Sequence, residues 1–182
     1  TGSSQSQGSV ERWHQTLFSQ VRVLMLALIE RQNIDKEALE VLHPILPWLL
    51  KHAVWLLNRY LIHDDGLTSY QRRFKQQSLP GLVEFGEKVL FKAHGRHHVA
   101  KADPSFREGF WIGRDPDSGE HLVFSPEGVT KSRSIKRLPP SSKWHLDVLT
   151  KCSAVPWDLK GDGSFDPRFF LQDKPSQQLF QQ

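Results

Sequence analysis

The chain has 182 residues, a formal net charge of +4 and an isoelectric point near 9.3, a basic balance that is compatible with polyanionic partners without requiring one. Its length allows one domain of ordinary size or two small ones. The single cysteine, Cys152, excludes an intramolecular disulfide and a multi-thiolate zinc site, and it favours an intracellular setting. Because the chain starts at Thr1 and its only methionine is Met25, we expect it to be a piece of a longer protein.

The first predicted element is a long amphipathic helix that begins near Val10. The polar stretch SQSQGS before it, with Gly8 near its end, is typical of a turn. Glu11 then falls in the first helical turn, where the macrodipole favours an ionised carboxylate. Apolar residues that step by three or four positions predict the buried side of this helix; they are Val10, Trp13, Leu17, Val21, Leu24 and Leu28.

Two further helices are predicted before residue 62. Asp35 is a suitable N-cap for a short helix over 36–42, and Pro47 can occupy the first turn of a helix that ends near Leu61. The second of these is apolar on nearly all sides, so it is either the centre of a helical layer or half of a subunit interface. Its interior also carries Lys51 and Arg59, too polar a content for a bilayer core, so we expect a soluble protein without a membrane partner. Thr68 is then predicted to cap one or two helical turns.

The composition changes near Val83, and the following stretches alternate like β-strands. Tight turns at Pro116 and Pro126 would join the last three strands into a meander, and with the first strand these suffice for a small barrel. After residue 138 we expect an irregular arm with a frayed end. The predicted strands span 87–93, 108–114, 120–125 and 129–138, and their aromatic residues Phe91, Phe110, Trp111 and Phe124 are predicted to form the core.

The last predicted strand carries a basic run, KSRSIKR. Strict alternation would place Lys131, Arg133 and Arg137 on one face together with Ile135, so the strand bulges or that face is partly exposed. Two interpretations have equal weight: a solvated edge that blocks aggregation, or a surface that contacts phosphates. For the three histidines near residue 96 a solvated loop is favoured over a zinc site, because no thiolate or acid lies at ligand spacing; they are His94, His97 and His98.

Several motifs occur in a collinear order over the first 138 residues. QSQG (5–8) is followed by VER (10–12), then by LTSYQRRF (67–74), FGEKVLF (85–91) and GFWIGRDPDSGEHLVFSPEGVTKSRSI (109–135). This order resembles retroviral and retrotransposon integrases, copia-type elements in particular. The resemblance implies an α+β chain with the helical C-terminal portion of a ribonuclease-H-like catalytic core (1–83), an SH3-like small β-barrel (84–138), and an extended arm with a disordered tail (139–182).

The resemblance also implies a chemistry for the intact parent. Such integrases use two Mg²⁺ (or Mn²⁺) ions, held by two aspartates and one glutamate, to join element DNA to a target by strand transfer. Glu11 matches the glutamate, as both a metal ligand and a catalytic residue. No acid stands in the ten residues before it, so we expect this fragment to lack the aspartates, to hold no metal and to be inactive alone. The resemblance further implies a nuclear location.

DNA and other integrase subunits are the partners that the resemblance implies. Gln15 and Phe18 stand where retroviral relatives place DNA-contacting lysines, which is a departure from the family pattern. The alternative is a non-catalytic protein-interaction module derived from a transposable element, which the apolar helix around Trp48 and Trp55 would support. The predicted DNA-binding residues are Gln5, Gln7, Gly8, Arg12 and Arg22 in the first part of the chain, and Lys131, Arg133, Lys136 and Arg137 in the basic run.

Overall fold

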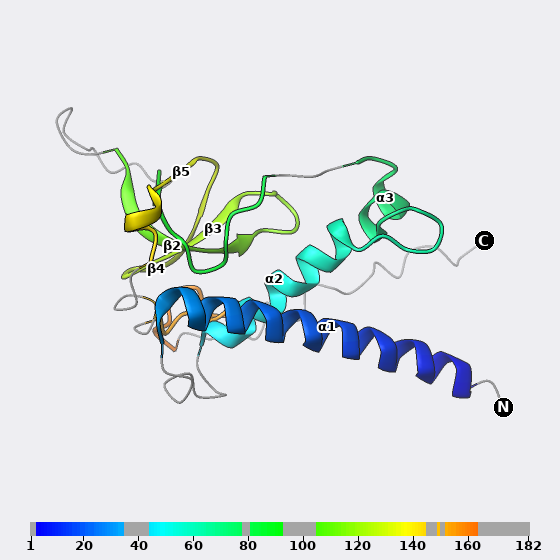
Figure 1. Cartoon of the computed structure of the whole chain (residues 1–182). Coiled ribbons are helices and arrows are strands. Elements are labelled where there is room, and N and C mark those ends of the chain that lie inside the picture. The colour runs from blue at the N-terminus through cyan, green and yellow to red at the C-terminus, as the bar shows by residue number, and fades with distance from the viewer. Residues whose placement is uncertain are drawn as a thin grey trace, which may run out of the picture.

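The computed structural model describes residues 3–34, 44–77, 81–92, 105–144, 149 and 152–163. Within these residues it contains three α-helices and one open five-stranded antiparallel sheet, which confirms an α+β chain (Figure 1). The helices are α1 (Ser3–Gln32), α2 (Ile45–Tyr60) and α3 (Ser69–Phe74). The strands are β1 (Lys88–Phe91), β2 (Arg107–Arg114), β3 (His121–Ser125), β4 (Gly128–Ser132) and β5 (Ile135–Arg137), and a 3-10 helix, η2, spans Pro140–Ser142.

The sheet has the strand order β4-β3-β2-β1-β5. β2, β3 and β4 form the predicted meander, whereas β1 lies between β2 and β5 and pairs with both. The first three predicted strands are confirmed to within two residues at each end. The turn after β2 is held by Asp115, whose Oδ1 accepts the backbone N–H groups of Asp117 and Ser118 at 3.1 and 2.9 Å.

The single strand predicted over 129–138 is wrong, because the chain bends between Ser132 and Ile135. The Ser132 side chain is buried, and its Oγ lies 2.9 Å from the carbonyl oxygens of both Lys92 and Ser134. This contact ends β4 and turns the chain across the sheet, so that β5 pairs with β1 at the opposite edge. The period-two alternation that would place Lys131, Arg133 and Arg137 on one face is therefore interrupted.

The loop predicted before Val10 is also wrong, because α1 already begins at Ser3. Gly8 lies inside the helix and does not have the left-handed backbone that a turn would require. One glycine costs a helix about 1 kcal/mol relative to alanine, which is too little to stop a helix propagating from the apolar segment that follows. Gln5 and Gln7 belong to the same helix, and their side chains lie outside the described part of the chain.

The buried side of α1 is shorter than its apolar pattern predicts. Leu17, Val21 and Leu28 are buried against the rest of the protein, whereas Val10 and Trp13 are 54% and 46% exposed. Figure 1 shows why: the N-terminal half of α1 extends away from the sheet, beyond the layer that covers its other half. The apolar stripe of α1 thus continues past the core of this chain.

α2 lies at the centre of the helical layer, which is the first of the two interpretations of its apolar sequence; the other is half of a subunit interface. Trp48 and Leu49 are completely buried and Trp55 is nearly so. One core cluster joins both long helices to one face of the sheet, with Leu28 from α1, Trp48 from α2 and Phe110 from β2. A second cluster on the other face contains Val89, Phe91, Trp111 and Val123. The four aromatic residues predicted to form the core are buried, as expected.

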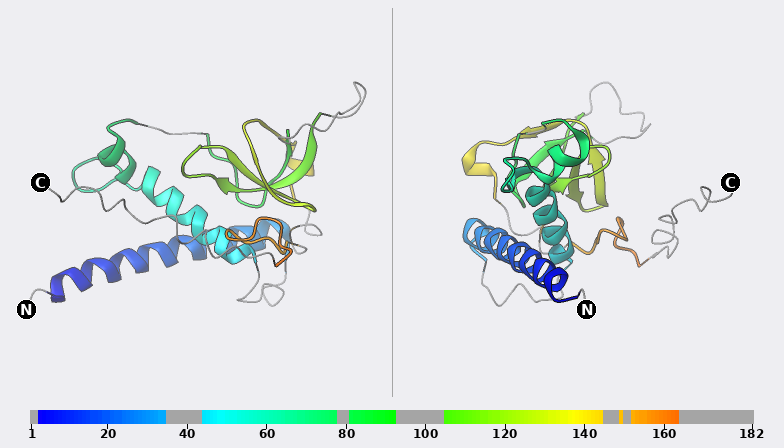
Figure 2. Two further views of the ribbon diagram at one scale, coloured as in Figure 1. Left: turned by 180° about the vertical axis from the view of Figure 1, so that it is seen from behind. Right: turned by 90° about the vertical axis from the view of Figure 1, so that its right-hand side faces the viewer.

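The segment 152–163 closes one side of this core and lies beside α2 (Figure 2). Trp48 Nε1 donates a hydrogen bond to the Ala154 carbonyl at 2.9 Å, and Val129 N–H at the start of β4 donates to Leu159 at 2.7 Å. Residues 36–42, predicted as a short helix, and the tail after 163 lie outside the described residues. No helix among those described is long and apolar enough to cross a membrane.

The predicted helix ends at Pro47 and Thr68 are confirmed. Pro47 occupies the first turn of α2, where a missing N–H breaks no helical hydrogen bond. Thr68 caps α3 through a reciprocal pair of bonds with Gln71: Thr68 Oγ1 accepts the Gln71 N–H at 3.2 Å, and Gln71 Oε1 accepts the Thr68 N–H at 2.8 Å.

Candidate nucleic-acid interface

Glu11 lies well inside α1 rather than in its first turn. Since α1 starts at Ser3 and has no acid in its first turn, the expected support from the helix macrodipole is absent at Glu11. The side chain is exposed. A helical period of 3.6 residues places Glu11, Phe18 and Arg22 on one exposed side, about 100° from the side that carries Leu17 and Val21.

Glu11 stands apart from other candidate metal ligands. In the ranges that the structure describes, there is no group of three or more histidine, cysteine or acidic side chains that could hold a metal ion. A two-metal site needs several carboxylate oxygens, and Glu11 contributes one carboxylate. The described residues therefore do not fit a pair of Mg²⁺ ions, and the predicted metal chemistry remains a prediction about the intact parent.

Two cations of α1 are accessible to solvent. Arg12 and Arg22 both lie on exposed parts of the helix. Arg12 Nε donates to the Gly8 carbonyl at 3.2 Å, which leaves its terminal nitrogens directed to solvent or to a ligand. Gln15 and Phe18 are exposed on the same helix.

The other predicted DNA-binding cations lie where the chain passes from β4 to β5, and we call Lys131, Arg133, Lys136 and Arg137 the basic corner. Their surroundings differ greatly. Arg133 is the most accessible: its side chain is 79% exposed, and its Nε lies 3.2 Å from Glu120 in a surface ion pair. Lys136 is exposed as well, with its ammonium 4.3 Å from the centre of the Phe106 ring. Both charges are within reach of a phosphate.

Lys131 and Arg137 are held by buried carboxylates instead. Lys131 Nζ lies 2.7 Å from Asp115, whose side chain is 8% exposed. Burial by itself would raise the pKa of Asp115, but the bond from Lys131 and those from nearby backbone N–H groups lower it to about 2. Arg137 donates two bonds of 2.7 Å to Glu87, which is completely buried.

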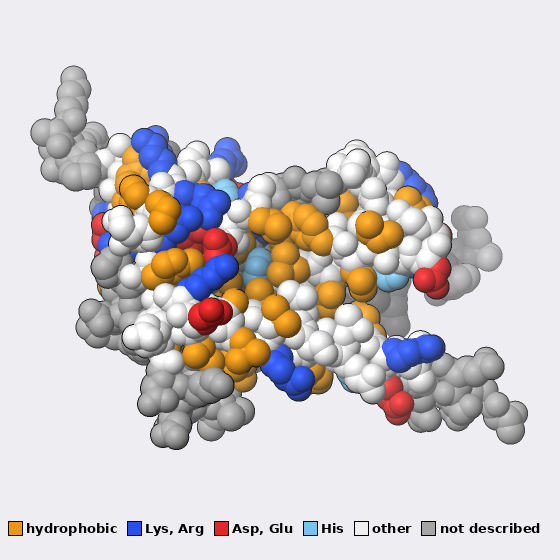
Figure 3. All heavy atoms as spheres, in the orientation of Figure 1, with side chains coloured by type: hydrophobic (Ala, Val, Ile, Leu, Met, Phe, Trp, Pro, Cys, Tyr) orange, Lys and Arg blue, Asp and Glu red, His pale blue; other side chains and the backbone are white. Residues whose placement is uncertain are grey.

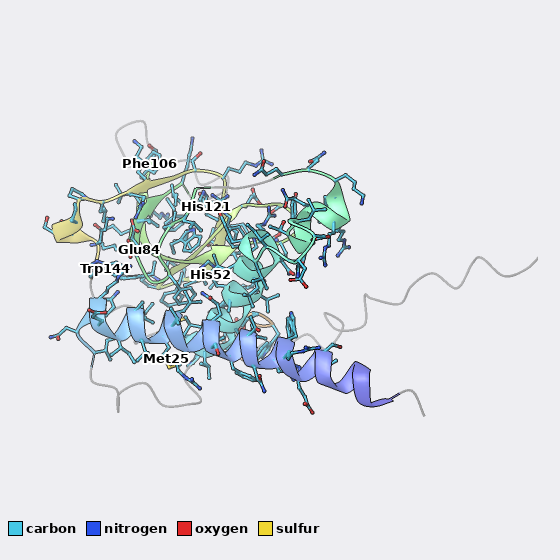
Figure 4. All side chains as sticks on the ribbon, turned by 45° about the vertical axis from the view of Figure 1, so that its right-hand side comes forward. Met25, His52, Glu84, Phe106, His121 and Trp144 are labelled. Carbon is cyan, nitrogen blue, oxygen red and sulfur yellow. The ribbon has the colours of Figure 1, made fainter. Side chains whose placement is uncertain are left out.

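The Arg137–Glu87 pair belongs to a larger charged cluster between the sheet and the C-terminal end of α1. Arg31 of α1 pairs with Glu84, and Lys143 approaches Glu87 at 3.8 Å. Figure 3 shows basic and acidic side chains side by side on this part of the surface, and Figure 4 places Glu84 and Trp144 where α1 meets the sheet. This cluster ties α1 to β1 and β5, so Arg137 has a structural role that the sequence analysis missed.

Two histidines flank Trp111: His52 is buried and His121 is partly buried. His52 of α2 contacts the Trp111 ring edge-on at 5.1 Å between ring centres, and His121 Nδ1 accepts the Trp111 indole N–H at 3.0 Å. Burial lowers the pKa of each to about 4, and the charge of Arg114 contributes at His121. Both are labelled in Figure 4. They are neutral packing residues, and the three histidines predicted near residue 96 lie outside the described residues.

The sequence analysis also missed a groove between α2 and α3. Arg59 and Arg114 both line it although they are far apart in the sequence. Neither stands in a basic run, so composition alone could not reveal them.

A scan against models of protein families, a search of curated proteins and a search of solved structures each returned no match for this chain.

Proposed function

We propose that this chain is the DNA-binding and subunit-contacting C-terminal part of a retrotransposon-type integrase. The observation that carries the proposal is the order of its elements: an acid-bearing long helix, a capped helix at TSYQ, and a five-stranded antiparallel sheet, in the order that the motifs predict. Strand transfer belongs to the intact parent in this proposal, because of the family's three acids only Glu11 has a match in the sequence.

The proposed fold of residues 84–138 is an SH3-like barrel. Two features support it. β1 pairs with β2 on one side and β5 on the other, which brings the last strand back beside the first. The cluster of Val89, Phe91, Trp111 and Val123, with Ile135 packed against it, provides an apolar interior. Small barrels of this kind are filled by side chains.

The proposed contact with duplex DNA is made by Arg133 and Lys136 of the basic corner, and on α1 by Arg12 and Arg22. These four cations are exposed, and none is paired with a buried acid in the described structure. Phosphate contacts are formed by such exposed cations without base specificity. Arg137 and Lys131 are excluded from the proposed contact because they neutralise Glu87 and Asp115.

Fluorescence anisotropy of the full chain with a labelled 20-base-pair duplex tests the proposal. We expect binding that weakens steeply between about 50 and 200 mM salt, because each neutralised phosphate releases counterions. Each phosphate contact should contribute about −0.9 to the slope of log K against log salt. The double variant Arg133→Gln with Lys136→Gln should bind more weakly than wild type, and Lys160→Gln, an exposed lysine outside the basic corner, should not. Absent or salt-independent binding would overturn the proposal.

The rival function is a protein-interaction module, and the residues that support it differ from those that the sequence indicated. Trp48 and Trp55 are buried within the chain and cannot contact a partner. Val10 and Trp13 can contact a partner, since they extend the apolar side of α1 beyond the core of the chain. A second copy of the chain is the proposed partner. Light scattering after size exclusion would then show a stable dimer, without affinity for DNA, that Trp13→Glu dissociates and the neighbouring His14→Glu does not. An assembly that forms only with DNA favours the integrase proposal, and a monomer at all concentrations excludes the rival.

A further inference from the structure

The groove between α2 and α3 combines cations with aromatic rings. It has a volume of about 750 Å³ and is bounded by α2, α3, the turn after β2 and residues 156–157. Its cationic lining is Lys51, Arg59, Arg73 and Arg114, against which Asp117 is the one acid among the described lining residues. Figure 3 shows Lys and Arg side chains gathered over α3 at one end of this region. The excess of positive charge favours an anionic ligand.

Two arginines of the groove lie over aromatic rings. The Arg59 guanidinium lies 4.0 Å from the centre of the Tyr70 ring and 5.2 Å from that of Trp55. Arg73 lies 5.2 Å from the Phe74 ring, and the Tyr70 and Phe74 rings are themselves 4.6 Å apart and tilted by 38°. Positive charge and aromatic surface are therefore presented together in this groove.

One cation of the groove has unused hydrogen-bonding capacity. Arg114, at the end of β2, donates from Nη1 to the Gly119 carbonyl at 2.9 Å, while its buried Nε has no partner among the described residues. Burial lowers the pKa of Arg114 and also that of Lys51. In the described structure no carboxylate lies within 4.0 Å of Arg73, Arg114 or Lys51. An incoming anion would therefore supply a partner to these cations rather than displace an existing one.

Exposed aromatic residues stand at the rim. Trp157 is 42% exposed and Phe74 50% exposed, although both are large apolar side chains. Aromatic faces that remain open beside cations are the arrangement used to stack the bases of unpaired strands while the cations follow the backbone. The volume is in the range of ligand-sized sites, roughly 300–1,000 Å³, which suits one or two nucleotides and not a base-paired duplex.

We propose that the groove between α2 and α3 binds single-stranded nucleic acid, with phosphate held by Arg73 and Arg114 and a base stacked on Trp157. The inference rests on the proposed DNA-binding function and adds a second, structurally separate site to it. An acidic peptide would satisfy the cations equally well. The exposed Trp157 and Phe74 side chains, beside arginines that lie over aromatic rings, favour a ligand that carries flat rings as well as negative charge.

Fluorescence anisotropy of the full chain with labelled oligo-dT of 15 nucleotides provides the test. We expect Trp157→Ala to weaken this binding by about 5- to 150-fold, the range for loss of one stacked base. Arg73→Gln should also weaken it and make its salt dependence less steep, because one phosphate contact is lost. Lys75→Gln is the matched control, because it removes one positive charge one turn or less from Arg73 at an exposed position outside the groove. Circular dichroism melts should show that all three variants remain folded, as expected for exposed side chains.

The outcomes separate this inference from the proposed function. If all three variants bind oligo-dT with the same affinity, the groove is not the binding site, whatever the result for the duplex. If polyglutamate competes as well as unlabelled oligo-dT, and Trp157→Ala weakens the binding of both equally, the ligand of the groove is an acidic peptide and the proposal of nucleic acid is wrong. Loss of duplex binding in the basic-corner variant with oligo-dT binding intact supports two sites. Sensitivity of oligo-dT binding to Trp157→Ala with no duplex binding supports the groove and rejects the proposed duplex contact.

Discussion

Arg137 and Glu87 form a bidentate pair, with both hydrogen bonds at 2.7 Å, and the glutamate is completely buried while the arginine reaches the surface. The Glu87 carboxylate raises the pKa of Arg137 above its usual value, chiefly through this hydrogen bond. A cation that neutralises a buried acid is not free to bind phosphate. This pair gives Arg137 a different role from Arg133, which is only four residues away in the same basic run.

Substitution of Arg137 by glutamine should therefore affect stability rather than DNA binding. Removing one partner of a fully buried pair costs about 3–5 kcal/mol. The loss here should be smaller than that but above about 1 kcal/mol, because Glu87 is buried while Arg137 is 43% exposed and Lys143 remains 3.8 Å from Glu87. Arg133→Gln removes an exposed pair with Glu120 and should cost at most about 1 kcal/mol. Urea unfolding measures both. Equal free energies of unfolding for the two variants would contradict the role assigned to Glu87.

His52 should make the protein less stable in mild acid. Its pKa is about 4 in the folded protein because of burial and 6.5 for an ordinary histidine, so below pH 6.5 the unfolded chain binds a proton that the folded chain does not. Stability from this residue is complete above pH 6.5 and is lost as the pH falls toward 4, by about 2 kcal/mol at pH 5. A proton on the buried Nδ1 would have no hydrogen-bond acceptor in the described structure, which adds to the cost of the charged form.

The measurement is urea unfolding at pH 7 and pH 5 for wild type and for His52→Leu. The leucine variant should lose less stability between these pH values, because it carries no titrating group at this position. His14→Gln, a change at an exposed position of α1, should keep the wild-type difference. An unchanged pH dependence in His52→Leu would show that acid sensitivity arises elsewhere.

Gly128 allows segment 152–163 to dock on the sheet. It has a φ of +112°, and a Cβ at this position would lie 2.4 Å from the Leu159 carbonyl oxygen, which accepts the Val129 N–H at 2.7 Å. Gly128→Ala should therefore cost about 2–4 kcal/mol, from backbone strain together with the displaced hydrogen bond.

Gly119 provides the control for that substitution. It also has a positive φ, +70°, but a Cβ there would have no atom within 4 Å. Gly119→Ala isolates the backbone strain of about 1–2 kcal/mol. Thermal unfolding of the two variants should differ clearly, and equal melting temperatures would mean that residues 159–160 contribute nothing to the stability of β4.

The local elements could be predicted from the sequence, because their signals are local. The alternation of apolar and polar residues, together with the prolines at 116 and 126, located three strands, and Thr68 with Gln71 gave a capping signal within four residues. Two other local patterns led to wrong predictions. Gly8 resembled a turn although one glycine is too weak to end a helix. The bend after Ser132 depends on the Lys92 carbonyl, 40 positions earlier, which no local pattern contains.

The candidate interface was less predictable for the same reason. A basic run identifies charges but not their partners, and the partner of Arg137 lies 50 residues away, immediately before β1. The groove between α2 and α3 is likewise assembled from segments that are distant in the sequence, and Arg59 and Arg114 in its lining have no basic neighbour in the sequence. Exposed Trp13 and Val10 differ from buried Leu17 and Val21 only in how far the core extends along α1.

The salt dependence of duplex binding tests the central proposal most directly. The wild-type slope of log K against log salt should become less steep by about 0.9 for each of Arg133→Gln and Lys136→Gln, and by twice that in the double variant. Arg137→Gln, measured where it is folded, and Lys160→Gln should leave the slope unchanged. Slopes that are the same in wild type and in the double variant would contradict duplex DNA binding at the basic corner.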